Sequence, residues 1–212
     1  SVISAQQLVT LPLGEIISLG QKHGCRWPNH MPGYFLLRSE FGAYENQSDF
    51  RISLARVDTK SLGSSTEQID ALYPIDSLEV GAEVQIKISN ASARYGQALV
   101  FLGYDDDYVS RLDEDQAFSL RCLLRISDLA TGDTLLNHPD GDPFRVLPGT
   151  GLFSLYGFSF SANLDLDRVF GMILEENKPL SNDETNTVIQ TIKRMTIDDP
   201  KAVGVASYAY KV

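Results

Sequence analysis

The eight residues from His23 to His30 hold two of the three histidines, one of the two cysteines and the only tryptophan of the chain. A thiolate beside an imidazole is the basis of Cys–His nucleophilic catalysis, because the imidazole lowers the thiol pKa. One alternative is therefore a Cys25-dependent hydrolase with His23 or His30 as its base. The same three side chains can ligate zinc. Neither spacing matches a known signature, so the sequence favours a loop with a buried Cys25 and a packed Trp27.

Acidic turns offer a second kind of chemistry. Asp140 and Asp142 stand two residues apart in one turn, and Asp165 and Asp167 do so in another. Carboxylates at this spacing can reach one calcium ion, which takes about six to eight oxygen ligands. Neither turn carries the glutamate that completes an EF-hand loop. We expect either a calcium-supported carbohydrate or adhesion module, or four carboxylates that are solvated or cap their own turns.

Aromatic side chains are the third candidate feature. Exposed tyrosines on a sandwich can stack on sugars or anchor a protein interface, whereas buried ones form core, which the sequence favours here. The residues concerned are Tyr95, Tyr104, Tyr108, Phe153, Tyr156, Phe158, Phe160, Tyr208 and Tyr210. No Walker loop, G-x-S-x-G elbow, H-E-x-x-H or C-x-x-C sequence occurs.

The elements that would position these residues read as short strands. Phe50–Val57 and Glu83–Ile88 alternate apolar and polar residues, and turn residues such as Asp140-Gly141 separate the apolar segments. The other predicted strands are Tyr34–Leu37, Ala98–Gly103, Phe118–Ile126, Phe144–Leu147, Gly151–Phe160, Arg168–Leu174 and Val203–Val212. This pattern predicts a mostly-β fold, an antiparallel β-sandwich of the jelly-roll or Ig-like kind.

One short C-terminal helix is predicted at about 181–195. Ser181 and Glu184 form a capping box, in which each side chain bonds to the backbone N–H of the other residue. Val188, Ile192 and Met195 follow as an apolar stripe at helical spacing.

The length of the chain and its net charge limit the number of domains and the kinds of binding partner that we expect. We expect residues 1–212 to form a single β-rich domain, with a polar stretch near 61–78 as the one candidate sub-boundary. The net charge of −10 argues against nucleic acid, because phosphate binding needs clustered Lys and Arg. No apolar stretch approaches ~18 residues, so no membrane span is predicted.

The cysteine count excludes a disulfide-rich scaffold. Cys25 and Cys122 can form one disulfide or remain two buried thiols. The sequence begins with Ser1 rather than Met, which fits a processed chain, and we expect an extracytoplasmic, mature exported protein.

From residue 78 onward the order of features resembles a known family. The segments that carry the resemblance are Val80–Ile86, Ala98–Asp105, Phe144–Gly149, Arg168–Leu174 and Lys178–Leu180. They are similar to a bacterial β-sandwich domain of unknown function that is often appended to caspase-like peptidases or kinases. The resemblance covers residues 78–180 and implies a non-catalytic accessory or binding role in a bacterium.

No candidate cluster reaches a catalytic spacing, whereas strands and aromatic residues abound. The sequence therefore predicts a non-enzymatic β-sandwich module that has no organic cofactor. We expect this module to bind a protein partner or to associate with itself. The Cys25-dependent hydrolase and the calcium-supported carbohydrate or adhesion module stay open as alternatives.

Overall fold

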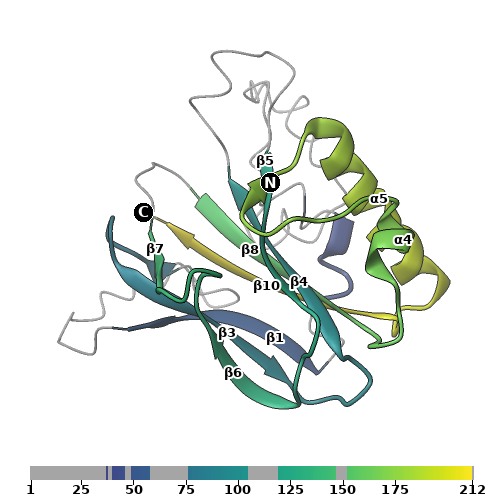
Figure 1. Cartoon of the computed structure of the whole chain (residues 1–212), viewed down its shortest axis with the longest axis horizontal. Coiled ribbons are helices and arrows are strands. Elements are labelled where there is room, and N and C mark those ends of the chain that lie inside the picture. Colours follow the sequence, from purple (N-terminus) through teal and green to yellow (C-terminus); the bar gives the residue numbers. More distant parts are fainter. Residues whose placement is uncertain are drawn as a thin grey trace, which may run out of the picture.

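A computed structural model describes residues 37, 40–45, 49–57, 76–104, 119–146 and 152–211. In this part of the chain two β-sheets face each other, and helices cover the outer face of the larger sheet (Figure 1). The predicted mostly-β sandwich with a C-terminal helix is confirmed.

The smaller sheet has the strand order β1-β3-β6, and β7 also pairs with β3. Its strands are β1 (Phe50–Arg56), β3 (Glu83–Asn90), β6 (Gly132–Leu136) and β7 (Phe144–Arg145). The larger sheet has the order β2-β10-β8-β4-β5-β9. Its strands are β2 (Asp76–Ser77), β4 (Gln97–Tyr104), β5 (Ser119–Ile126), β8 (Leu152–Phe160), β9 (Lys178–Pro179) and β10 (Val203–Lys211). Among these pairs, only β10 and β2 run parallel.

The larger sheet is buried on both faces, so the fold has two cores. The core between the sheets contains Phe50, Ile52, Val84, Ile86, Ile88, Ala98, Val100, Leu124, Leu155 and Ala206. The core between the larger sheet and the helices contains Phe41, Leu99, Phe101, Cys122, Tyr156, Phe158, Phe160, Val188, Ile192, Val203 and Val205. Strands covered on both faces lack polar positions, which explains the unbroken apolar run that predicted β4.

Side-chain alternation follows the sequence prediction in β3, and β10 shows the same alternation. Val84, Ile86 and Ile88 of β3 all face the core between the sheets. In β10, Val205 packs toward the helices and Ala206 toward the smaller sheet. Successive side chains of a strand point to opposite faces, so one strand serves both cores.

The helix α5 (Asn182–Asp198) confirms the predicted capping box and ends three residues beyond the predicted stop at 195. The Ser181 hydroxyl accepts a hydrogen bond from the Glu184 backbone N–H at 3.2 Å, and Glu184 Oε2 accepts one from the Ser181 N–H at 2.8 Å. This hydrogen bonding lowers the pKa of Glu184. Val188 and Ile192 are buried against the larger sheet, so the apolar stripe holds α5 in place.

Two strand predictions were wrong, and three described strands, β2, β6 and β9, were not predicted. Arg168–Leu174 was expected to be a strand, but Leu166–Phe170 forms the short helix α4, because Asp165 caps its N-terminus and Gly171 ends it at φ 66°. Leu37, the only described residue of the strand predicted at 34–37, is helical, which places it on the same face as the buried Phe41. The sequence did not predict β6, whose residues are mostly exposed.

The sheets pack closest where β8 and β10 carry glycine. The Phe50 ring of β1 fills the space beside Gly157, so that a Cβ there would lie 3.0 Å from Phe50 Cε1. A Cβ on Gly204 would collide with Ser159 Oγ and lie 3.1 Å from Phe50 Cβ. Side chains are therefore excluded from both positions at this end of the sandwich.

The single-domain prediction for residues 1–212 and the candidate sub-boundary near 61–78 stay predictions, since 58–75 lie outside the described residues. Among the helices that the structure describes, none has the length and apolar character needed to cross a membrane.

We expect Gly204→Ala to lower the free energy of unfolding by about 1–3 kcal/mol, because the added methyl group overpacks the contact with Phe50 and Ser159. Urea unfolding followed by circular dichroism measures the change. Ser207→Ala, three residues further along the same strand, is the control and should stay within about 0.5 kcal/mol of the wild type. Equal stability of Gly204→Ala and the wild type would contradict the proposed close packing.

Candidate functional site

The residues of the predicted Cys–His site, Cys25, His23 and His30, lie outside the described part of the chain. The hydrolase and zinc interpretations that rest on them therefore stay predictions. Cys122, which is described, is a free and buried thiol. Burial, followed by the nearby Glu176 carboxylate, raises the pKa of Cys122 to about 12, which makes it a poor nucleophile at neutral pH.

The first acidic pair lies in the loop between β6 and β7. Asp140 Oδ2 is 3.1 Å from His138 Nδ1, and the Asp142 backbone carbonyl accepts a hydrogen bond from the His138 N–H at 2.9 Å. Asp140 is 80% exposed, so this contact is open to water. Both aspartates thus help to hold the His138 loop.

The second acidic pair lies at the start of α4. Asp165 accepts a hydrogen bond from the Arg168 N–H at 3.2 Å, and Asp167 Oδ1 lies 2.6 Å from Arg125 Nη1. The hydrogen bond to Asp167 raises the pKa of Arg125. Each carboxylate thus has a protein partner, and within the described ranges no three His, Cys, Asp or Glu side chains form a metal-binding group. Calcium binding at either pair stays a prediction.

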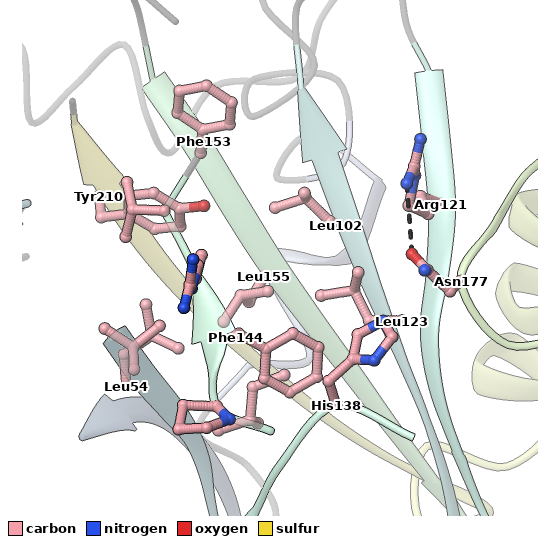
Figure 2. Close-up of a pocket in the computed structure, with 15 residues that line it drawn as sticks. Leu54, Leu102, Arg121, Leu123, His138, Phe144, Phe153, Leu155, Asn177 and Tyr210 are labelled. Atoms are coloured by element: carbon pink, nitrogen blue, oxygen red, sulfur yellow. Dashed lines mark hydrogen bonds between the residues drawn. The ribbon is translucent and has the colours of Figure 1, made fainter. Parts of the chain in front are cut away.

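The clearest candidate site is a pocket of about 260 Å³ between the two sheets (Figure 2). Strands β5, β4, β8 and β10 of the larger sheet form one wall, and β1, β3 and β7 with the loop before β7 form the other. The fifteen described lining residues are Leu54, Val84, Ile86, Leu102, Arg121, Leu123, His138, Pro143, Phe144, Arg145, Val146, Phe153, Leu155, Asn177 and Tyr210.

The pocket lies at the end of the sandwich away from the close glycine packing. Along β8, Gly157 lies against Phe50, whereas Leu155 and Phe153 line the pocket. Along β1, Leu54 lines the pocket, four residues beyond Phe50. The two sheets thus meet tightly at one end and leave space between larger side chains at the other.

The polar side chains among the described lining residues are Arg121, His138, Arg145, Asn177 and Tyr210. Arg121 and Asn177 lie together on one side, and Tyr210 with Phe153 lies on the other (Figure 2). Arg121 Nη1 donates a hydrogen bond to Asn177 Oδ1 at 3.2 Å. His138 packs the edge of its ring against Phe144, with ring centroids 5.5 Å apart.

Tyr210 presents a phenol to the pocket. Its ring stacks on Phe153 with centroids 5.3 Å apart and an interplanar angle of 11°. Its hydroxyl makes no hydrogen bond to a residue that the structure describes, and it points toward the side of the pocket that Leu102 lines (Figure 2). Burial raises the pKa of Tyr210 to about 12, so the phenol remains a hydrogen-bond donor at neutral pH.

The sequence predicted core roles for nine aromatic residues, and the burial of seven of them is described. Of these seven, Tyr95, Tyr156, Phe158, Phe160 and Tyr210 are buried. Phe153 and Tyr210 belong to the pocket wall, which the sequence did not predict. Arg121 was the available signal, since it stands between the buried Leu120 and Cys122, but Arg125 of the same strand does not line the pocket.

Comparison with known proteins identifies no relative. No protein-family model matches the chain, and neither a curated protein nor a solved structure matches it significantly. The resemblance of residues 78–180 to a bacterial β-sandwich domain therefore stays an expectation.

The raised pKa of Tyr210 makes a prediction about stability at alkaline pH. Because the pKa is about 12 in the folded protein and 10.0 for an unperturbed tyrosine, this group stabilises the fold fully below pH 10. That contribution, at most about 2–3 kcal/mol, should be lost as the pH rises from 10 to 12. Tyr210→Phe should lack this loss, and urea unfolding of both proteins at several pH values measures it.

Cys122 and the other tyrosines are present in both proteins, so the difference between them isolates Tyr210. Absorbance at 295 nm provides an independent test, since the wild type should form one more phenolate near pH 12 than Tyr210→Phe does. A phenolate of Tyr210 that appears at pH 10 in the folded protein would contradict its burial.

Proposed function

We propose that this protein is a non-enzymatic binding module whose pocket between the sheets takes a small, largely apolar ligand. The observation that carries this proposal is the pocket itself, in which ten of the fifteen described lining residues are apolar and five carry polar groups. Small-molecule sites have this composition, in which apolar surface supplies affinity and a few polar groups supply orientation.

The size of the pocket limits the ligand. A cavity of about 150 Å³ accommodates benzene, so 260 Å³ corresponds to about ten non-hydrogen atoms. This volume lies slightly below the range of about 300–1,000 Å³ that small-molecule sites span. A linear chain of about eight carbons or a bicyclic aromatic compound therefore matches the space.

The side chains around the pocket support binding rather than turnover. The fifteen described lining residues include no Ser, Thr, Cys, Asp, Glu or Lys. The buried Cys122 belongs to the other core, on the far side of the larger sheet. A protein partner, self-association, the Cys25-dependent hydrolase and the calcium-supported module remain predictions from the sequence.

Binding of 1-octanol tests the proposal, because this neutral ligand has about nine non-hydrogen atoms. At roughly 0.5 kcal/mol per atom it should bind with a Kd of about 1 mM or tighter. Leu54→Trp, which places a bulky ring at the pocket wall, should weaken binding at least about tenfold. Isothermal titration calorimetry and ligand-detected NMR measure both affinities.

Leu135→Trp is the matched control for Leu54→Trp. Leu135 belongs to the same sheet, is 53% exposed and does not line the pocket, so this variant adds the same ring without blocking the site. It should bind 1-octanol like the wild type. No binding to the wild type, or equal binding to the folded Leu54→Trp variant, would disprove the proposed function.

A further inference from the structure

We infer that the ligand of the pocket is a small amphipathic carboxylate whose head group is held by Arg121. Its apolar tail lies across Leu102, Leu123 and Leu155 toward Tyr210. This inference rests on the proposed function and adds to it the charge and the orientation of the ligand.

A β-bulge turns Arg121 toward the pocket. Val100 of β4 pairs with Leu124 of β5, but the next residue, Phe101, pairs with Cys122, so Leu123 is an extra residue in β5. A bulge of one residue reverses the facing of every position beyond it. Cys122 therefore faces the helices while Leu123 and Arg121 line the pocket.

Asn177 positions the Arg121 guanidinium. The Asn177 backbone has φ 56°, a left-handed conformation that Asn adopts more readily than most residues. Its N–H donates to the Cys122 carbonyl at 2.6 Å, and its Oδ1 accepts from Arg121 Nη1 at 3.2 Å. The guanidinium has five N–H donors in a planar fork, so donors remain for both oxygens of a carboxylate.

Among the described residues, Arg121 is the arginine of the pocket that has no carboxylate partner. Arg145 pairs with Glu83 at 3.2 Å and is 73% exposed, and His138 lies beside Asp140. No carboxylate that the structure describes pairs with Arg121. The described lining also lacks acidic residues, although the chain has 28 acidic and 18 basic residues. The pocket is thus complementary to an anion and offers no carboxylate to an amine.

The width of the wall fits an extended tail. Arg121 and Tyr210 lie on β5 and β10, which are three strands apart in the order β10-β8-β4-β5. Neighbouring strands are about 4.8 Å apart, so the two ends of the pocket are separated by about 14 Å. A carboxylate with about eight carbons spans much of this distance, with its apolar part over the leucines of the intervening strands.

The test compares octanoate, 1-octanol, octylamine and octyl sulfate by isothermal titration calorimetry at neutral pH. The wild type should bind octanoate at least about tenfold more tightly than 1-octanol, since a charge-assisted hydrogen bond exceeds a neutral one. Arg121→Gln should abolish this preference and leave the affinity for 1-octanol within about twofold of the wild type. Arg121→Lys should restore part of the preference.

Arg125→Gln is the matched control, because it removes the other arginine of β5, which pairs with Asp167 and does not line the pocket. It should keep the preference for octanoate. Equal affinity of the wild type for octanoate and 1-octanol, or an unchanged preference in Arg121→Gln, would overturn the inference while the proposed function stands. Tighter binding of octyl sulfate or octylamine than of octanoate would overturn the assignment of a carboxylate. Failure of all four ligands to bind would refute the proposed function as well.

Discussion

Phe50 of the smaller sheet occupies the space that side chains on Gly157 and Gly204 of the larger sheet would need. This packing determines how closely the sheets approach at one end of the sandwich. The same strands carry Leu54, Leu155 and Tyr210 toward the other end, where the pocket opens. The pocket therefore follows from an uneven distribution of side-chain size along three strands. The two sheets touch where the residues are small, and a cavity remains where large side chains face each other without filling the space.

The larger sheet joins the two halves of the structure because apolar side chains cover both of its faces. Its outer face packs against α4 and α5, and its inner face forms one wall of the pocket. The bulge at Leu123 connects these two environments, since it assigns Cys122 to the helix side and Arg121 to the pocket side. One additional residue in a strand thus separates a buried, unreactive thiol from an accessible guanidinium.

Local patterns in the sequence were sufficient for most of the architecture but not for the site. Alternation predicted β1 and β3, and the Ser181 capping box predicted α5, because these signals lie within a few neighbouring residues. The pocket combines residues from seven of the described strands and from loops, and no local pattern records that arrangement.

The consecutive apolar residues 122–124 do reflect the bulge, but they also fit an unbulged, fully buried strand. Likewise, α4 depends on Asp165 and Gly171 at its ends rather than on a long apolar stripe. Its few apolar residues alone therefore predict a strand instead of a helix.

The position of β8 has a consequence for how the molecule opens. This strand is hydrogen-bonded along its length to β10 on one side and to β4 on the other, and both of its faces are covered. Its amide protons can therefore exchange with solvent only when the whole structure unfolds, whereas β6, which has mostly exposed residues and pairs only with β3, can detach in a local fluctuation. A slow-exchanging central strand and a fast-exchanging margin would divide the sandwich into a part that opens only on global unfolding and a part that opens locally.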